Sequence, residues 1–362
     1  MRVQLNPCRI SWSAVTALIA LTVGLLAAAS PVPAAVSCAK VASPSGSDSA
    51  AGTLFAPYRS AYKLANSLTP GQTGCLRGGS YSPTSTSGRY VLSPRRGGSP
   101  GTPITIRGYP GERARLVGIV DISNGVDNVT LTDLIFEGTG VMNTIKIYSA
   151  DVTIQNSEIT NAWRGLSCMI LGSNSGDGQA LRTIVRGNVF HACGNPANGN
   201  KDHGIYASNA LEAQIVDNIF YDSAAYAIQL YPNAQKVKVG HNVIDGDSPS
   251  IRGGVTVSGD SSHASKSNTI GQNIITYSET YNLISSWSGP IGTGNVAASN
   301  CFWAGVRGDI ANNGGLAAFN NKTANPSFVN RQARDYRLGP NSPCLPVVGY
   351  DTAARYSGPI PQ

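Results

Sequence analysis

One short segment concentrates the side chains that can do chemistry: Lys201, Asp202 and His203 stand just before Tyr206. Cleavage of a uronate polymer by β-elimination needs a cation to neutralise the carboxylate, a base to remove the adjacent proton and an acid for the leaving oxygen. Lys201, His203 and Tyr206 suit these tasks, and we predict that they are catalytic. Asp202 suits Ca²⁺ binding or orientation of the histidine. The alternative is structural: a loop lysine, a turn aspartate and a histidine at the start of a strand.

Tyr206 belongs to one of three short segments in which apolar and polar residues alternate, at 204–208, 227–231 and 254–258. A period of two is typical of a strand with one buried face. If these strands lie side by side, the apolar residues point inward: Ile205, Ala207, Ile228, Leu230, Val255 and Val257. The residues between them then share one outer face with an earlier strand: Lys146, Tyr148, Tyr206, Ser208, Gln229, Tyr231, Thr256 and Ser258.

We predict that this outer face is a substrate-binding groove in which four side chains contact the sugar: Lys146, Tyr148, Gln229 and Tyr231. Tyrosine rings offer a flat surface on which sugar rings can stack. The alternative is that the tyrosines only fill an exposed strand face, where tyrosine is favoured in any case. A weaker candidate for the same groove is His263, in the loop after the last of these strands.

A repeated phrase indicates how such strands are held side by side. An apolar residue, two spacers, an asparagine and one or two apolar residues recur around Asn188, Asn218, Asn242, Asn273 and Asn300, at intervals of 30, 24, 31 and 27 residues. No amphipathic helix pattern separates the copies, and irregular repeats of this length are typical of a solenoid. We predict an all-β fold, a right-handed parallel β-helix. Each asparagine then occupies the same sharp bend, tolerates left-handed backbone and stacks its amide on the next copy.

Residues 1–35 have the parts of a secretory signal peptide. Arg2 and Arg9 supply the positive start, an apolar run follows at 14–29, and small residues at 32–34 offer a cleavage site. We therefore predict a secreted, extracellular protein.

Three further segments follow the signal peptide. Residues 36–81 form an N-terminal module, and apolar residues at helical spacing predict a helix at 58–68. Such a helix would cap the open end of the solenoid, whose first coil otherwise exposes its core. The β-helix is expected at 82–345, and residues 346–362 form a C-terminal tail.

Six cysteines remain after the signal peptide is removed. In an exported chain this number indicates three disulfides, which allow fifteen pairings. Because stacked coils bring sequence neighbours together, we predict the sequential pairs Cys38–Cys75, Cys168–Cys193 and Cys301–Cys344.

Charge and hydropathy limit the classes of partner. Without Arg2 and Arg9, 25 of the 27 basic residues remain against 20 acidic ones, a net charge of +5. A mildly basic exported protein is compatible with a polyanionic partner. We expect no nucleic-acid partner because the chain has no Lys/Arg run or basic helix, and no membrane contact because nothing after the signal is apolar enough to span one. We expect a monomer.

Two stretches resemble a known family. The first reads Ser43-Pro44-Ser45-Gly46-Ser47-Asp48, Gly52-Thr53, Pro57-Tyr58-Arg59, Pro70-Gly71-Gln72-Thr73 and Arg77-Gly78-Gly79-Ser80-Tyr81. The second reads Asn325-Pro326-Ser327-Phe328, Asp335-Tyr336-Arg337-Leu338 and Ser342-Pro343. They resemble the opening and the tail of secreted parallel β-helix proteins of the pectate lyase superfamily, which includes the family 9 polysaccharide lyases. The calcium aspartates and lysine base of family 9 match no motif here, so the resemblance implies the scaffold more than pectate specificity.

Together these features predict an enzyme that cleaves an acidic polysaccharide by β-elimination, with Ca²⁺ as a candidate cofactor. One alternative is a glycoside hydrolase, which needs two carboxyl groups about 5–10 Å apart. The pairs that qualify for testing are Asp202 with Asp260 and Asp222 with Asp245. The other alternative is a non-catalytic glycan-binding surface protein, which the low charge and the degraded last repeat allow.

Overall fold

The computed structural model describes residue 1 and residues 37–247, 252–286 and 289–348. The chain divides into two units, Met1–Val36 and Ser37–Gln362, and all the described helices and strands belong to the second. The predicted signal peptide, apart from Met1, and residues 349–362 of the predicted tail lie outside the described residues.

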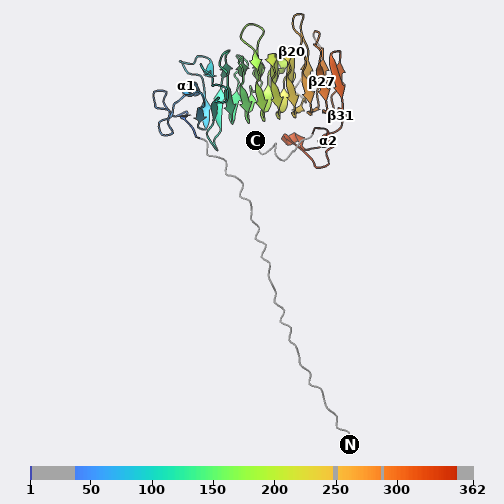
Figure 1. The fold of residues 1–362 in the computed structure, drawn as a ribbon, viewed down its shortest axis with the longest axis horizontal. Helices are drawn as coiled ribbons and strands as arrows, with labels where there is room; N and C mark the ends of the chain where they lie inside the picture. The colour runs from blue at the N-terminus through green and yellow to red at the C-terminus, as the bar shows by residue number, and fades with distance from the viewer. Residues whose placement is uncertain (2–36, 248–251, 287–288, 349–362) are drawn as a thin grey trace. The chain divides into compact units, whose positions relative to one another are not determined.

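The described strands stack as a solenoid of three parallel sheets, called A, B and C (Figure 1). Sheet A has the order β1 (Lys40–Ala42), β2 (Thr73–Leu76), β5 (Ile104–Gly108), β8 (Val129–Thr132), β11 (Thr153–Gln155), β15 (Ile184–Arg186), β18 (Gln214–Val216), β21 (Lys238–Gly240), β24 (Thr269–Gly271), β27 (Asn295–Ala298) and β30 (Leu316–Phe319). Sheet B has the order β3 (Gly79–Tyr81), β6 (Ala114–Val117), β9 (Leu134–Glu137), β12 (Glu158–Thr160), β16 (Val189–Cys193), β19 (Ile219–Ser223), β22 (Val243–Asp245), β25 (Ile274–Thr276), β28 (Cys301–Trp303) and β31 (Lys322–Thr323).

Sheet C carries the candidate site. Its order is β4 (Tyr90–Leu92), β7 (Ile119–Ile122), β10 (Ile145–Ile147), β13 (Met169–Leu171), β17 (Ile205–Leu211), β20 (Ile228–Gln235), β23 (Val255–Val257), β26 (Tyr281–Ser285) and β29 (Gly308–Asn312), with β14 (Ala180–Leu181) beside β17. The chain visits A, B and C in turn and returns to A one coil further on. The predicted parallel β-helix is therefore confirmed.

The other described elements lie near the N-terminal or C-terminal end of the solenoid, except for one short helix in the bend between β16 and β17. They are α1 (Ala61–Ser67), η1 (Pro196–Asn198), η2 (Arg331–Ala333), α2 (Leu345–Val348) and an antiparallel pair, β32 (Phe328–Asn330) with β33 (Asp335–Leu338). None of the described helices is long and apolar enough to cross a membrane.

The interior is filled by apolar side chains that repeat from coil to coil. The six residues predicted to point inward on sheet C are all fully buried. On sheet B, Phe190 and Phe220 stack with ring centroids 4.7 Å apart and an interplanar angle of 13°. Because each coil places its inward residues directly over those of the last, one continuous core forms along the axis.

The predicted asparagine file is also confirmed. The side-chain amide of Asn188 donates to Oδ1 of Asn218 at 3.0 Å, and the same bond links the later copies as far as Asn321. Each Oδ1 also accepts the backbone N–H of the preceding copy. The ladder therefore satisfies polar groups that the bend buries between sheets A and B.

One detail of the bend differs from the expectation. Left-handed backbone belongs to the residue before each asparagine, for example Asp217 (φ 62°), His241 (φ 53°) and Gln272 (φ 56°). The ladder asparagines are absent from the positive-φ positions of the described chain. Their side chains point inward to bond their neighbours, so the exposed or half-buried residue before each of them makes the turn.

The N-terminal module is held to the first coils. Helix α1 is shorter than predicted; it begins after Ser60, whose Oγ accepts the N–H of Lys63 at 3.0 Å. A Cβ at Gly74 of β2 would lie 2.5 Å from Leu64, so α1 packs directly on sheet A. Strands β1, β2 and β3 already belong to sheets A and B. The coil thus begins within residues 36–81, before the expected boundary at 82.

The three sequential disulfides are present: Cys38–Cys75, Cys168–Cys193 and Cys301–Cys344. The last one ties the chain near α2 to strand β28 of sheet B. Beyond β31, the described chain leaves the solenoid, which therefore ends earlier than the predicted residue 345.

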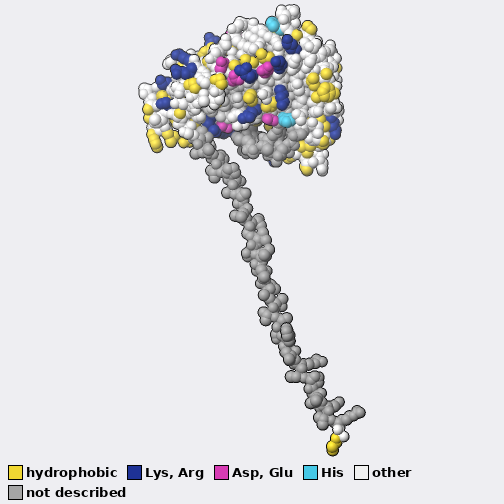
Figure 2. Space-filling view, viewed as in Figure 1, with side chains coloured by type: hydrophobic (Ala, Val, Ile, Leu, Met, Phe, Trp, Pro, Cys, Tyr) yellow, Lys and Arg dark blue, Asp and Glu magenta, His cyan; other side chains and the backbone are white. Residues whose placement is uncertain are grey.

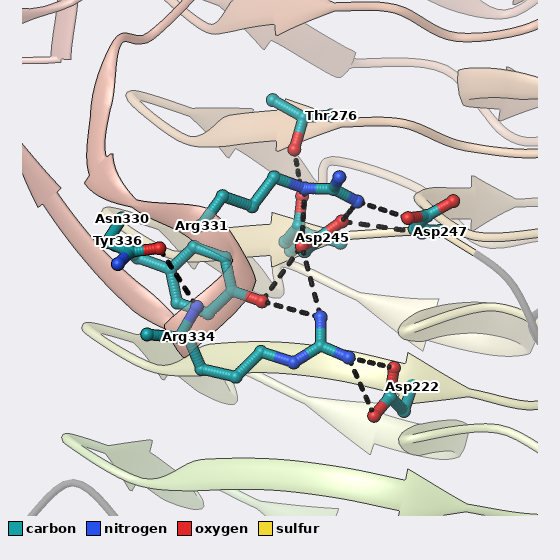
Figure 3. A network of polar contacts seen from close by, with 10 residues as sticks. Asp222, Asp245, Asp247, Thr276, Asn330, Arg331, Arg334 and Tyr336 are labelled. Carbon is teal, nitrogen blue, oxygen red and sulfur yellow. Dashed lines mark hydrogen bonds and ion pairs between the residues drawn. The ribbon is translucent and has the colours of Figure 1, made fainter.

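The segment 324–348 folds back over sheet B and is fixed there by a polar network (Figure 3). Asp245, whose side chain is fully buried, accepts from Arg331 at 2.7 and 2.9 Å and from the Tyr336 hydroxyl at 2.8 Å. Arg334 donates to both oxygens of Asp222 at 2.9 and 3.1 Å. Apolar residues surround the network: Val243, Ile274, Cys301, Leu338, Cys344 and Val348.

Many of the charged surface side chains pair between neighbouring coils. Examples are Arg107 with Asp133, Arg182 with Asp151 and Lys236 with Glu212, at 2.9, 2.6 and 3.0 Å. Figure 2 shows Lys and Arg side chains beside Asp and Glu side chains across one face of the solenoid. Pairs this exposed contribute little stability each.

Candidate functional site

The outward face of sheet C brings together residues that the sequence places on three separate strands. The strands pair in register, so one outward file runs Asp121, Lys146, Ile170, Tyr206, Gln229, Thr256 and Ile284. Neighbours in the file lie one coil apart, about 4.8 Å. Lys146, Tyr206 and Gln229 therefore share one face, as the alternating pattern predicts.

A second outward file lies two residues further along each strand: Ser123, Tyr148, Gly172, Ser208, Tyr231 and Ser258, with a register shift between Ala207 and Asn209 of β17. Its two predicted contact residues differ in exposure, because Tyr231 is half-buried and Tyr148 is only 6% exposed. Lys146 and Gln229 are also buried. The expected tyrosine platform is thus reduced to Tyr206 and Tyr231, and Tyr148 supports the face from within.

Lys146 forms a buried ion pair that sequence analysis did not anticipate. Its Nζ lies 3.0 Å from Oδ1 of Asp121 and 5.1 Å from the centroid of the Tyr148 ring. The other Asp121 oxygen accepts the Ser123 hydroxyl. Burial, with the nearby carboxylates of Asp177 and Asp121, raises the pKa of Tyr148. A lone aspartate within the apolar run of β7 is the sequence signal that could have revealed this pair.

Tyr206 lies at the centre of the face, and its side chain, which carries a phenol hydroxyl, is half-buried. Burial raises its pKa, a hydrogen bond with Ser208 lowers it, and the neighbouring Tyr231 and Asp260 raise it again; the net shift is upward. The phenol therefore stays protonated at neutral pH. It can donate a proton to an oxygen that develops negative charge.

His203 takes a different position from the one expected of a catalytic base. It is 2% exposed, and its Nδ1 accepts the backbone N–H of Tyr226 at 3.3 Å. Its ring lies between those of Tyr206 and Tyr226, at centroid distances of 5.8 and 5.9 Å, and it hydrogen-bonds Gln229. Burial lowers its pKa to about 3. A neutral ring enclosed in this way cannot collect a proton from a bound polymer, but it does position Tyr206 and Gln229.

Asp202, the expected calcium ligand, is also enclosed. It is 1% exposed, and its Oδ2 accepts from the backbone of Leu166 and Asn195 and from the Asn198 amide at 2.8–2.9 Å. Calcium needs six to eight oxygen ligands, whereas the partners here are N–H donors. In the described part of the chain no three His, Cys, Asp or Glu side chains cluster as a metal site. The surroundings of Asp202 do not fit calcium. Lys201, by contrast, is exposed at the loop.

The carboxyl pairs considered for a hydrolase are not available to a substrate. Asp222 and Asp245 are both engaged by Arg334, and Asp245 also by Arg331, beneath the C-terminal segment (Figure 3). Asp202 is buried and occupied, so it cannot act with Asp260. Each carboxylate is already committed to a partner within the protein, which removes the specific basis for the hydrolase alternative.

One pocket lies away from sheet C. It has a volume of about 670 Å³ and is lined by residues 44, 46–49, 59–60 and 80–86, mostly serine and threonine. Its carboxylate, Asp48, accepts the backbone N–H groups of Arg59 and Ser60 and the Ser60 hydroxyl. That carboxylate therefore serves the start of α1, and the pocket gathers no catalytic group.

Comparisons with known proteins agree with the fold. The structure of pectate lyase Pel9A aligns with a TM-score of 0.51 at 14% identity over 85% of this chain and 91% of that one. This chain is a parallel β-helix with the fold of pectate lyase Pel9A. A rhamnogalacturonan lyase aligns with a TM-score of 0.52 at 12% identity, over 80% of this chain and 90% of that one. At these identities the likeness concerns the fold alone.

A sequence match supports the same scaffold over a shorter stretch. Pectate lyase PEL9 of Emericella nidulans is 39% identical over 80 residues, which is 22% of this chain and 18% of the relative's length. The match thus spans about a fifth of the curated relative. No family model matches the chain.

Proposed function

We propose that the chain is a secreted polysaccharide lyase that cleaves an acidic polysaccharide by β-elimination at the outward face of sheet C. The observation that carries the proposal is the file in which Lys146, Tyr206 and Gln229 lie on successive or nearby coils. The fold shared with Pel9A and the partial match to PEL9 support it. A polymer that lies along the solenoid axis would cross this file and meet Tyr206, its half-buried member, while Lys146 and Gln229 lie buried beside it.

Within this proposal the side chains take distinct roles. Tyr206 donates the proton to the leaving oxygen, because its raised pKa keeps it protonated. Lys201, exposed at the loop, attracts the uronate carboxylate, whereas Lys146, neutralised by Asp121, helps to hold the face in shape. Tyr231 packs against a sugar ring, while Gln229 and Tyr148 hold the face in shape. His203 becomes a positioning residue, because it is buried between two tyrosine rings.

The proposal also includes export from the cell, a limit on where Ca²⁺ can bind and a capping role for helix α1. Export is proposed from residues 1–35 and is compatible with three disulfides. Ca²⁺ would have to be held outside the surroundings of Asp202, so no step is assigned to it. Helix α1 is proposed to cap the first coil, because Leu64 is fully buried against Gly74.

The test is ultraviolet absorbance from unsaturated uronate ends, measured on a panel of pectate, alginate and glycosaminoglycans with Ca²⁺ and with a chelator. We expect absorbance on at least one polymer, and its loss by about 100-fold or more in Tyr206→Phe, which removes the proton donor. Tyr109→Phe is the matched control, because Tyr109 lies in the bend after β5 beneath Arg77. Retention of a polymer without cleavage would instead identify a glycan-binding protein.

A further inference from the structure

A second aspartate–histidine group lies at the edge of sheet C, directly after strand β23. Nδ1 of His263 lies 3.1 Å from Oδ1 of Asp260 and 3.3 Å from its Oδ2. The same Oδ1 accepts the backbone N–H groups of Ser262 and His263 at 2.8 and 2.7 Å. A carboxylate cannot donate, so Nδ1 carries a proton toward Asp260, and the lone pair of the neutral ring is on Nε2.

Hydrogen bonds fix the conformation of the loop that carries this pair. Gly259 and Ala264 form an antiparallel bridge, and the N–H of Asp260 donates to the carbonyl of His263 at 2.8 Å. The Ser258 hydroxyl donates to the carbonyl of Gly289 at 3.2 Å, which ties the loop to the next coil. The histidine side chain is 38% exposed. It is thus oriented by the protein and open to solvent.

The pair lies on the Tyr206 side of the sheet. In the register of β20 and β23, Leu230 faces Val257, so Ser258 follows beside Tyr231 in the second outward file. Asp260 comes two residues later. Its carboxylate, together with Tyr231, raises the pKa of Tyr206, whose hydroxyl bonds Ser208 in that same file. The register therefore places the Asp260–His263 pair on the same side of sheet C as the phenol of Tyr206.

The other histidines are unsuited to this face. The chain has four, all among the described residues. His191 lies on sheet B, where its Nε2 is 3.2 Å from Glu158 and its ring stacks on Tyr221. His203 is buried. His241 lies at the asparagine bend between sheets A and B. Of the four, only His263 offers an oriented, exposed imidazole on the Tyr206 side of sheet C.

We propose that His263, oriented by Asp260, is the base of the elimination, an inference that rests on the proposed function. Nε2 of His263 takes the proton from the carbon next to the uronate carboxylate. The electron pair of that C–H bond forms the new carbon–carbon double bond, and the bond to the leaving glycosidic oxygen breaks. The oxygen takes the proton of the Tyr206 hydroxyl. His263 then returns its proton to solvent and Tyr206 regains one, so charge and atoms balance.

The test uses the full-length protein with a polymer that the wild type cleaves. His263→Ala should lower kcat by about 100-fold or more with little change in KM, and added imidazole should restore part of the rate. Asp260→Asn should also lower kcat, because the amide no longer favours the tautomer with its lone pair on Nε2. His241→Asn is the matched control, because His241 also lies near an aspartate, Asp217 at 3.7 Å, but on another face. That variant should keep wild-type kinetics.

The outcomes separate the two proposals. A wild type that produces no unsaturated ends on any uronate polymer overturns the lyase proposal and this inference with it. An active wild type with a fully active His263→Ala overturns the inference alone. A loss of rate in His263→Ala that imidazole does not rescue, accompanied by a lower unfolding midpoint, assigns His263 a structural role and also overturns it.

Discussion

At the scale of single residues, the pair formed by Lys146 and Asp121 is a sensitive point of sheet C. Its side chains are 10% and 9% exposed. Lys146→Met leaves a buried carboxylate without its cation, and we expect the free energy of unfolding to fall by about 3 kcal/mol or more. Urea denaturation measures the change. Lys236→Met is the control, because the Lys236–Glu212 pair is 62% and 42% exposed and should contribute less than about 1 kcal/mol. Equal losses in the two variants would contradict the expectation.

His203 gives a second prediction, on the pH dependence of stability. Burial lowers its pKa to about 3 from an ordinary value of 6.5. The unfolded chain therefore binds a proton that the folded protein excludes. The stability present above about pH 6.5 is lost as the pH falls toward 3, by about 1 kcal/mol per pH unit. His203→Gln removes this titration.

The measurement is the unfolding free energy of both proteins at about pH 7 and about pH 5, a range chosen above the ordinary pKa of most carboxyl groups. We expect the wild type to lose more stability across this interval than His203→Gln. The comparison concerns the slope with pH, so a lower absolute stability of the variant does not affect it. Identical slopes would show that the histidine is accessible to protons in the folded state.

The alternation of apolar and polar residues predicts which side chains share a face, but it does not predict how deeply they are buried. Alternation placed Lys146, Tyr206 and Gln229 on one side of the strands, and the register agrees. Whether a side chain is buried depends on the residues that the next coil places over it. His203 and Tyr226 each stand two residues before an inward isoleucine, so stacking the coils brings their rings together. That equivalence is visible in the sequence, but its consequence for solvent access requires the packed structure.

At the scale of elements, the asparagine ladder sets the register of sheets A and B. Asn242 is fully buried; its oxygen accepts two N–H groups of Asn218, and its amide donates to Ile215 and Asn273. Asn242→Ala leaves these partners unsatisfied, and we expect a loss of about 3 kcal/mol or more. Chemical unfolding checks this. Asn124→Ala, at an exposed turn, is the control and should change stability by less than about 0.5 kcal/mol.

The elements also separate what local patterns predict from what they do not. Five copies of one phrase suffice to predict the ladder, and neighbouring coils account for Cys38–Cys75 and Cys168–Cys193, whereas Cys344 of the third disulfide lies in the segment that has left the coil. The left-handed residue before each asparagine was missed, because Gly187, Asp217, His241 and Gln272 share no side-chain type. At that position the backbone, rather than a common side chain, makes the turn.

At the scale of the whole molecule, the fold of segment 324–348 over sheet B was not predictable from pattern. Arg331 meets Asp245 across 86 residues, and Arg334 meets Asp222 across 112. Coil spacing cannot indicate such contacts, because the segment has left the repeat. From the sequence, Asp222 and Asp245 instead qualify as a carboxyl pair for a hydrolase. Their partners become visible only when the last residues are placed against the sheet (Figure 3).

The last prediction concerns the ion pairs that Arg331 and Arg334 form with sheet B. In the double variant Arg331→Met and Arg334→Met, the buried carboxylate of Asp245 loses both cations, and we expect segment 324–348 to separate locally from sheet B. Hydrogen exchange should become faster across that segment while the asparagine ladder stays protected. The Cys301–Cys344 disulfide still tethers the chain, so the solenoid itself need not unfold.

Arg337→Met is the matched control for the double variant. Arg337 lies in β33 of the same segment, but it binds Asp335 two residues away and its side chain is 51% exposed. Its loss removes a local, solvent-screened contact rather than a bond to sheet B, so exchange across 324–348 should stay at the wild-type rate. If the double variant exchanges no faster than this control, the apolar contacts of Leu338, Cys344 and Val348 hold the segment without the ions. The network in Figure 3 would then fix the position of the segment while contributing little to its attachment.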